Sequence, residues 1–330
     1  MKISVQGSET SFECGDDYIL RAALGEGLGF PYECGSGSCG NCRFELVEGE
    51  IAYPHGTPSI LTEKDAARNR HLACQCKPAS DVTIKVRFFP DYAPLHQPST
   101  FPATLTEVVP VTHDIYEFRF ETEANQPFTA GQYALIELPG VPGDRAYSMC
   151  NTGAEPGRWD FQIKKVPNGK ASVTLFDDVK VGQQVRLSGP YGRGYFRGFR
   201  GRDVVLVAGG SGLSPMVSIA RAAAAAPRAG ERVFFYYGGR GLIDLAGESF
   251  LAPLDGYGDW MRYAAALSDS GDTGANFKGF VHDLVKSQHG DALTGMDVYF
   301  AGPPLMGAAM EGMIREMKIP ADQVFYDRFY

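Results

Sequence analysis

Polar and apolar side chains alternate along several segments between residues 103 and 199. The apolar members of two such segments are Tyr116, Phe118 and Phe120, and then Trp159, Phe161 and Ile163. A period of two is typical of strands that bury one face. Because Gly/Pro turns separate these strands, this region predicts an antiparallel β-barrel.

The period changes after residue 200. Continuous apolar runs there alternate with helical stretches, which is typical of an α/β domain with a parallel sheet covered on both sides. The apolar runs are Val204–Ala208, Val233–Tyr237, Tyr263–Leu267 and Val298–Ala301, and the predicted helices are Ser214–Ala226 and Leu305–Lys318. In the second helix Met306, Met310, Met313 and Met317 recur at helical spacing, which favours core packing over a binding face.

The first 92 residues predict a smaller α+β unit with a mixed sheet. Its expected strands are Lys2–Gln6, Ser11–Glu13, Arg43–Val47 and Asp81–Val86, and its expected helices are Ile19–Gly25 and Thr62–Arg70. Pro90, Pro94, Pro98 and Pro102 then favour extended backbone over both helix and sheet. We therefore predict domains at residues 1–92, 103–199 and 200–330, with a proline-rich linker at 93–102.

Cysteines give the first unit a specific chemistry. Cys34, Cys39 and Cys42 form a C-x4-C-x2-C run, and Cys74 and Cys76 follow at a distance. A run of this kind completed by one more cysteine is typical of a plant-type 2Fe-2S cluster, which needs four thiolates. The run also contains Gly35, Gly37 and Gly40, and glycines can take positive φ and bring backbone N–H groups close to sulfur.

Two other uses of these cysteines fit the pattern less well. A structural zinc ion could take Cys39 and Cys42 as one pair and Cys74 and Cys76 as another, but Cys34 would then have no role. Disulfides need an oxidising compartment, whereas the chain has seven cysteines, an odd number, and its start, MKISVQG, lacks the apolar segment of a secretion signal. The pattern favours the iron–sulfur cluster.

Two segments around these cysteines resemble the ferredoxin domain of flavin-dependent reductases that serve bacterial multicomponent oxygenases, most of all the toluene and phenol monooxygenase type. The segments are Phe30-Pro31-Tyr32-Glu33-Cys34 through Cys42, and Leu72-Ala73-Cys74-Gln75-Cys76-Lys77-Pro78. The resemblance implies a β-grasp ferredoxin fold for residues 1–92. It also implies Cys74 as the fourth ligand of the cluster, with Cys76 as the alternative.

The barrel region resembles the FAD domain of the same reductases. Arg145-Ala146-Tyr147-Ser148 matches their R-x-Y-S signature, and Gly131-Gln132-Tyr133 and Gly169-Lys170-Ala171-Ser172 fall at their other flavin contacts. A four-residue string occurs by chance, so its value comes from its place between the cysteine motif and the last domain.

The match implies a role for each of these flavin-site residues. Arg145 would bind the flavin diphosphate, Tyr147 would lie against the isoalloxazine, and Ser148 would bond to N5, which accepts hydride. Gly169, Lys170 and Ser172, at the start of a predicted helix Ala171–Phe176, would offer backbone N–H groups to phosphate.

The last domain contains a glycine turn between a strand and a helix, Gly209-Gly210-Ser211-Gly212-Leu213-Ser214-Pro215. A dinucleotide pyrophosphate can bind at such a helix N-terminus. The turn is neither a P-loop nor the full G-x-G-x-x-G fingerprint. It does match the G-G-[ST]-G-[IL]-x-P loop of the reductase family, as do Tyr237-Gly238-Gly239-Arg240 and Gly302-Pro303-Pro304-Leu305-Met306. Ala301 stands where the family usually has a cysteine near the reacting nicotinamide, which puts the hydride-transfer geometry in question.

The choice between NADH and NADPH depends on two sites. In a plain Rossmann interpretation, Arg240 would favour NADP through its 2′-phosphate. In the reductase family, however, NADH-dependent members share this arginine, and the phosphate-binding members carry Ser-Arg at the end of the next strand. Here that position is Ser268-Asp269. A carboxylate there would repel the phosphate and could accept ribose hydroxyls, so NADH is the expected cofactor.

The tail Phe325-Tyr326-Asp327-Arg328-Phe329-Tyr330 resembles the aromatic tail of the monooxygenase reductases. Relatives lay a C-terminal aromatic ring over the flavin face opposite the R-x-Y-S tyrosine. This resemblance makes Tyr330 the first candidate for that shield and Phe329 the second. An aromatic end strand that fills the core is an equally good interpretation.

Net charge limits the partners. The chain carries a formal charge of −8, which argues against nucleic acid or an anionic membrane as a partner. About half of the excess lies in residues 1–92, with nine Lys/Arg against thirteen Asp/Glu. An acidic docking surface and ordinary solubility both account for it. The longest apolar stretch is broken by Gly209, Gly210, Gly212 and Pro215, so we expect a soluble, cytoplasmic protein.

Together the motifs predict an electron path from NADH to FAD, then to the 2Fe-2S cluster, and then to a protein acceptor. The resemblance implies a Rieske ferredoxin or a di-iron hydroxylase of an aromatic or alkene monooxygenase system as that acceptor. Three alternatives stay open: a reductase of a ring-hydroxylating dioxygenase, a redox-sensing binding protein, and a zinc-stabilised interaction module.

Overall fold

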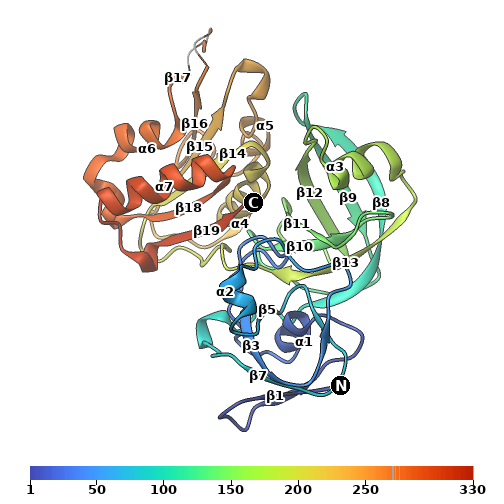
Figure 1. The fold of residues 1–330 in the computed structure, drawn as a ribbon. Helices are drawn as coiled ribbons and strands as arrows, with labels where there is room; N and C mark the ends of the chain where they lie inside the picture. Colours follow the sequence, from blue (N-terminus) through green and yellow to red (C-terminus); the bar gives the residue numbers. More distant parts are fainter. Residues whose placement is uncertain (270, 272, 275, 330) are drawn as a thin grey trace.

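The computed structural model describes residues 1–269, 271, 273–274 and 276–329. Three domains follow one another along the chain and meet around one junction (Figure 1). We call them the N-terminal, barrel and C-terminal domains. The predicted fold classes, a β-grasp α+β unit, an antiparallel β-barrel and an α/β parallel sheet, are confirmed.

The N-terminal domain has a five-stranded mixed sheet in the order β2-β1-β7-β3-β5. Ile3, Phe44 and Ile84 of this sheet pack in one core against Ile19 and Leu24 of helix α1. The elements are β1 (Lys2–Val5), β2 (Ser11–Glu13), α1 (Ile19–Gly25), β3 (Arg43–Glu48), β4 (Ile51–Ala52), α2 (Glu63–Ala66), β5 (Arg70–Leu72), β6 (Lys77–Pro78) and β7 (Val82–Lys85).

The helix predicted at Thr62–Arg70 is wrong beyond its first turn. Thr62 and Asp65 form a capping box that starts α2, but Asn69 takes φ 47°, which a continuing helix does not allow. Its side-chain amide donates to the carbonyl of Leu46 at 2.7 Å. Arg70 then enters β5, because pairing with β3 supplies the backbone partners that a longer helix would have supplied.

The barrel domain is a six-stranded antiparallel sheet in the order β11-β10-β13-β8-β9-β12. A bridge between Met149 and Phe161 brings its two edges together, and Trp159 lies in the enclosed core. The elements are η1 (Pro90–Tyr92) before the barrel, then β8 (Ser99–Pro110), β9 (Ile115–Glu121), β10 (Tyr133–Glu137), β11 (Arg145–Ser148), β12 (Arg158–Lys164), α3 (Lys170–Val173), a π-turn η2 (Thr174–Asp178) and β13 (Gln184–Tyr191).

The extended linker predicted at 93–102 is wrong at its end, because β8 already begins at Ser99. Phe101 and Ala103 are buried in the barrel core, which favours a strand there. Pro102 is tolerated because only β13 pairs with β8 at this point, and the pairing with β9 begins at Thr104. The helix predicted at Ala171–Phe176 is present as α3 and η2, and it starts one residue earlier.

The C-terminal domain is a parallel six-stranded sheet in the order β17-β16-β15-β14-β18-β19. Separate apolar clusters fill its two faces, one under α4 and α5 and the other under α6 and α7 (Figure 1). The elements are β14 (Val204–Gly209), η3 (Gly210–Gly212), α4 (Leu213–Ala225), β15 (Val233–Gly239), η4 (Leu242–Asp244), α5 (Glu248–Leu251), β16 (Met261–Leu267), β17 (Phe277–Lys278), α6 (Val281–His289), η5 (Gly290–Gly295), β18 (Asp297–Gly302), α7 (Pro304–Glu316), η6 (Ala321–Gln323) and β19 (Val324–Arg328).

The methionines of α7 pack as predicted. Met310 and Met313 are buried, and Met306 and Met317 pack at the margin of the same cluster. Met306 has a second contact that the pattern did not predict, because it also lines a surface cleft at the ends of β14 and β18.

Candidate electron-transfer site

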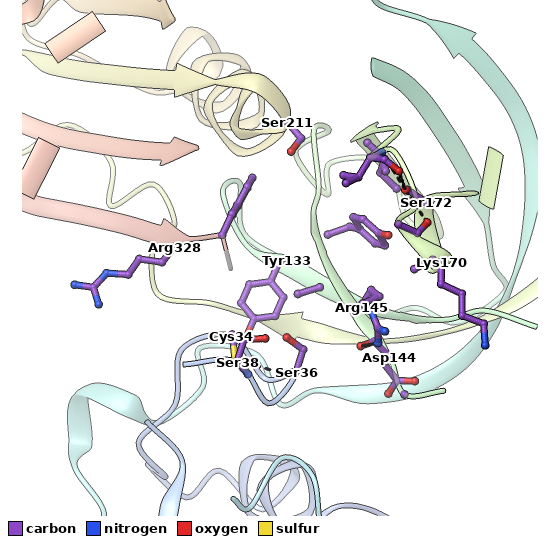
Figure 2. Close-up of a pocket in the computed structure, with 18 of the residues that line it drawn as sticks. Cys34, Ser36, Ser38, Tyr133, Asp144, Arg145, Lys170, Ser172, Ser211 and Arg328 are labelled. Atoms are coloured by element: carbon purple, nitrogen blue, oxygen red, sulfur yellow. Dashed lines mark hydrogen bonds between the residues drawn. The ribbon is translucent and has the colours of Figure 1, made fainter. Parts of the chain in front are cut away.

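A cleft of about 1000 Å³ lies where the three domains meet. Figure 2 shows Cys34, Ser36 and Ser38 of the N-terminal domain on one side, and Arg145, Lys170 and Ser172 of the barrel on another. Ser211 of the C-terminal domain completes the wall. Residues from all three predicted cofactor motifs therefore line one continuous space.

The cysteine loop is shaped by its glycines. Gly35, Gly37 and Gly40 take φ of 63°, 91° and 75°, which side chains with a Cβ rarely adopt. As a result the N–H groups of Ser36, Ser38 and Cys39 point at the sulfur of Cys34, at 3.4, 3.3 and 3.3 Å.

The environment of Cys34 favours a thiolate. A hydrogen bond from the Cys39 thiol lowers the pKa of Cys34 to about 5, and the backbone N–H groups add to this effect against the cost of burial. The sulfur atoms of Cys42 and Cys74 lie 3.2 Å apart. Cys42, Cys74 and Cys76 are all buried in the N-terminal core.

This donor set fits a 2Fe-2S cluster, which needs four thiolates with N–H groups directed at the sulfurs. The described thiol contacts, Cys34 with Cys39 and Cys42 with Cys74, join the four predicted ligands.

One side chain links the cysteine loop to the barrel. The hydroxyl of Tyr133, in β10, donates to the backbone carbonyl of Glu33 at 2.6 Å, and both Tyr133 and Cys34 line the cleft (Figure 2). A Cβ at Gly35 would lie 3.2 Å from this hydroxyl, so glycine allows the close approach. Burial raises the pKa of Tyr133 well above its ordinary value, so its phenol stays a hydrogen-bond donor.

Two further contacts hold the N-terminal domain in place. The hydroxyl of Tyr32 accepts the N–H of Gly192 at 3.1 Å. Arg21 of α1 forms an ion pair with Asp144, the residue before the R-x-Y-S motif, and both side chains are largely buried.

The R-x-Y-S strand β11 presents Arg145, Tyr147 and Ser148 to the cleft. Burial raises the pKa of Tyr147 to about 12, so its ring carries no charge at neutral pH. The guanidinium of Arg145 donates to the carbonyls of Pro142 and Asp144 at 3.2 and 3.1 Å, which fixes it at the cleft edge. A flat uncharged ring beside a fixed cation suits a flavin and its diphosphate.

Ser172 takes a more structural position than its motif implied. Its hydroxyl donates to the carbonyl of Gly169 at 3.0 Å and accepts the N–H of Val166 at 3.1 Å. It therefore shapes the turn that leads into α3, while the exposed Lys170 reaches along the cleft wall (Figure 2).

A second cleft of about 500 Å³ lies at the carboxyl ends of β14, β15 and β18. The predicted nucleotide-binding residues that line it are Gly209, Gly210, Arg240, Ser268 and Pro303. Ligands of open parallel sheets bind at this edge. Gly210 and Pro303 also line the first cleft, so the two spaces are continuous there.

Three predicted nucleotide-binding residues lie outside both clefts. A Cβ at Gly212 would come within 1.9 Å of the carbonyl oxygen of the buried Ala301, and a Cβ at Gly302 within 2.8 Å of the sulfur of Met306. Both glycines therefore allow close packing of helix on sheet. Asp269 is exposed, and its N–H donates to the carbonyl of Arg240 at 2.9 Å. The side chain of Arg240 is 67% exposed, and its guanidinium forms an ion pair with Asp244 at 3.7 Å.

The barrel and C-terminal domains are joined through serines of α4. The hydroxyl of Ser214 donates to the carbonyl of Ser148 at 2.6 Å, and the hydroxyl of Ser218 donates to the carbonyl of Asn151 at 2.6 Å. The helix that follows the glycine turn is thus anchored directly behind the R-x-Y-S strand.

The proposed aromatic shield is described only in part. Tyr330 lies outside the described residues, while Phe329 lines the first cleft and also packs against the core of the C-terminal domain. Asp327, two residues earlier, lines the same cleft, and burial raises the pKa of its carboxyl to about 7.

The sequence motifs gave no sign of one other wall of the first cleft. Residues 55–59 of the N-terminal domain line it. They belong to no motif, because tertiary packing alone brings them there.

Comparison with known proteins accords with this geometry. The sequence profile of a 2Fe-2S iron-sulfur cluster binding domain matches residues 3–79, that of an oxidoreductase FAD-binding domain matches 102–196, and that of an oxidoreductase NAD-binding domain matches 206–312. The protein is therefore an oxidoreductase that uses a 2Fe-2S cluster, FAD and NAD(H).

Full-length relatives place it more closely. The ferredoxin–NAD(P)+ reductase CarAd of Metapseudomonas resinovorans is 37% identical, over 94% of both chains. The ferredoxin–NAD+ reductase component of the alkene monooxygenase system of Xanthobacter autotrophicus is 36% identical, over 97% of this chain and 98% of the relative. A solved ferredoxin reductase in carbazole 1,9a-dioxygenase superposes with a TM-score of 0.91 at 35% identity, over 100% of this chain and 98% of the other. The chain belongs to this family of ferredoxin–NAD(P)+ reductases and reductase components of oxygenase systems.

Among the described residues, every helix is too short or too polar to cross a membrane.

Proposed function

We propose that the protein passes electrons from NADH through FAD and a 2Fe-2S cluster to a separate protein of an oxygenase system. The observation that carries the proposal is the single cleft that the cysteine loop, the R-x-Y-S strand and the glycine turn share. Bound FAD supplies the conversion of a two-electron hydride donor into single electrons. The chain itself supplies binding and positioning.

Each group of residues has a distinct task in this proposal. Cys34, Cys39, Cys42 and Cys74 hold the cluster as thiolates, and Cys34 is prepared for this by its N–H partners. Tyr147 packs against the flavin ring, Ser148 bonds to it, and Arg145 and Lys170 face the diphosphate. The tail covers the opposite face of the ring through Tyr330 or, on the described residues, Phe329.

The pyridine nucleotide enters along the second cleft, so that its reacting ring reaches the first cleft between Gly210 and Pro303. We propose NADH as the preferred donor. The carboxylate of Asp269 lies beside Ser268 at the end of β16, where it would repel the 2′-phosphate of NADPH. The backbone N–H of Asp269 donates to the carbonyl of Arg240 at 2.9 Å, so the two residues are neighbours at the ends of β15 and β16.

A ferredoxin of the Rieske type is the acceptor that we favour over a di-iron hydroxylase. The two relatives at 37% and 36% identity are both named ferredoxin reductases, whereas the reductase component of phenol 2-monooxygenase from a Pseudomonas species is 30% identical. Because the solved relative with a TM-score of 0.91 is a ferredoxin reductase in carbazole 1,9a-dioxygenase, a dioxygenase system is the second candidate. We also propose a cytoplasmic location, where thiols stay reduced.

The test begins with the purified protein, which should contain two irons and one FAD per chain. Stopped-flow mixing with NADH should bleach first the flavin and then the cluster absorption, and added Rieske ferredoxin should be reduced catalytically. Ferricyanide, a small acceptor, serves as the control for NADH oxidation. A protein that binds NADH and both cofactors but turns over with no acceptor would instead be a redox-sensing binding protein.

A further inference from the structure

The segment that connects the barrel to the C-terminal sheet is rich in arginine. Arg193, Arg197, Arg200 and Arg202 occur within ten residues of a chain whose net charge is −8. We call residues 192–202 the arginine segment. It starts at Gly192, whose N–H is bonded to Tyr32 of the N-terminal domain, so it lies at the junction of all three domains.

Two of these arginines have carboxylate partners. Arg200 binds both oxygens of the buried Asp297, with distances of 2.9 and 2.7 Å, and Arg202 lies 3.4 Å from the same carboxylate. These pairs connect the segment to the start of β18. Their charges are at least partly balanced within the chain.

Arg193 and Arg197 differ from this pair. Among the residues that the structure describes, neither has a carboxylate partner. The Arg193 guanidinium lies 4.1 Å from the ring centre of Tyr92, and that of Arg197 lies 3.6 Å from the ring centre of Tyr195. The Nε of Arg193 is buried with no hydrogen-bond partner in the described structure. Partial desolvation of the Arg197 guanidinium lowers its pKa, and the charges of Arg193 and Arg200 lower it further, although the residue as a whole is exposed.

The unbalanced positive charge lies next to the cysteine loop. Arg193 lines a small cleft of about 150 Å³ together with Asn41, which stands between Cys39 and Cys42. The loop from Cys34 to Cys42 contains no Asp, Glu, Lys or Arg. No side chain of this loop therefore supplies a carboxylate partner for the arginines.

Carboxylates at the floor of this small cleft are engaged within the protein. Glu33 is 16% exposed, accepts a hydrogen bond from Asn41 at 2.8 Å and lies 3.7 Å from Arg328. Asp327 is half-buried, and desolvation raises the pKa of its carboxyl to about 7. The outward rim of the cleft is thus formed by Arg193, with Arg197 exposed beyond it.

We propose that the arginine segment and the adjoining cysteine loop form the docking surface for the electron acceptor, and that this acceptor is a protein with a negatively charged face. The inference rests on the proposed function, because it assumes that electrons leave from the cluster. Charge complementarity selects the occupant. Opposite charges beside the exit point would steer an acidic partner into a productive orientation and raise its association rate at low salt.

The test is a double charge reversal, Arg193→Glu with Arg197→Glu. The matched control is Lys180→Glu with Arg186→Glu, which changes the net charge equally at exposed positions of the barrel. A third variant, Arg193→Lys with Arg197→Lys, keeps the charges while changing the ring contacts. Two protein acceptors of opposite charge are used with NADH: an acidic plant-type 2Fe-2S ferredoxin and the basic cytochrome c. Ferricyanide reports NADH oxidation without docking.

At low ionic strength we expect kcat/KM for the acidic ferredoxin to fall about tenfold or more in the charge-reversal variant and to lose most of its salt dependence. The rate with cytochrome c should stay the same or rise, and the ferricyanide rate should stay the same. The lysine variant should retain most of the wild-type rate with ferredoxin.

Three results would contradict the proposed docking surface. They are a ferredoxin rate equal to that of the control variant, an equal loss with both protein acceptors, and a lysine variant as slow as the glutamate variant. Failure of the proposed function is distinguishable, because the wild-type protein would then oxidise NADH with ferricyanide and reduce neither protein acceptor.

Discussion

Replacing Tyr133 by phenylalanine tests whether one hydrogen bond holds the cysteine loop against the flavin-binding barrel. The substitution keeps the buried ring and removes only the hydroxyl that donates to the Glu33 carbonyl at 2.6 Å. It also leaves intact two other links of the N-terminal domain, Tyr32 with Gly192 and Arg21 with Asp144. The change is therefore local to the approach of the loop.

The size of the effect follows from the burial of this bond. Tyr133 is 3% exposed, and loss of the donor leaves the Glu33 carbonyl without that partner. Removing one partner of such a bond costs about 1–3 kcal/mol, which is about 5- to 150-fold in the equilibrium between a docked and a detached loop. Amide exchange that requires loop opening should accelerate by the same factor.

Tyr191→Phe provides the matched control. Tyr191 is equally buried, its ring centre lies 5.8 Å from that of Tyr133, and its hydroxyl bonds to Ser188 at 2.8 Å within the barrel. Both variants should lose similar free energy of unfolding in urea. Only Tyr133→Phe should speed hydrogen exchange in residues 33–42 and slow bleaching of the cluster after NADH, with flavin reduction unchanged. Equal exchange of the loop in both variants would refute the reasoning.

Three further predictions concern the cluster, the tail and the nucleotide. Cys34→Ser should abolish iron binding and Cys76→Ser should retain it, as metal analysis will show; iron retained in both would contradict the ligand assignment. Burial raises the pKa of Asp327 to about 7, so the folded state holds a proton that the unfolded state releases above about pH 4, and stability should fall as pH rises from there through 7. Asp327→Asn should remove this loss of stability, measured by urea unfolding at about pH 5 and about pH 8. An unchanged pH dependence in the variant would show that Asp327 is not its cause. Asp269→Ala should lower the KM for NADPH several-fold with little effect on NADH; an unchanged ratio of the two kcat/KM values would count against a role in cofactor choice.

Local sequence patterns predicted the helices and strands of this protein better than the tertiary contacts between them. The predicted strands, such as Val204–Ala208 in the parallel sheet, follow from apolar periodicity, since burial of one or both faces leaves a direct trace in the sequence. The helix at Thr62–Arg70 failed because Asn69 and its bond to Leu46 redirect the chain into β5, and no periodicity reports such a tertiary contact. For the same reason the contribution of residues 55–59 to the first cleft could not be foreseen.

Motif residues also divided into two groups that a sequence cannot separate. Gly209 and Gly210 line the second cleft. Gly212, two positions later, instead allows the Ala301 carbonyl to pack against the start of α4. Ser172 matches a flavin motif, yet its hydroxyl donates a hydrogen bond to the carbonyl of Gly169 in the turn before α3. A sequence motif shows which residue type is required at a position. It does not show whether a ligand or a neighbouring backbone group requires it.

The contacts between domains suggest why the R-x-Y-S strand is the centre of the assembly. Ser214 and Ser218 of α4 bind the carbonyls of Ser148 and Asn151, and Arg221 binds that of Cys150 at 2.8 Å. Because backbone carbonyls are fixed by the barrel sheet, these bonds set the position of the nucleotide domain against the flavin site. The cysteine loop, in contrast, is held to the barrel through Tyr133 on the neighbouring strand. Adjacent strands of one sheet, β11 and β10, thus position the C-terminal domain and the cysteine loop. A rigid barrel is therefore sufficient to hold both next to the R-x-Y-S strand.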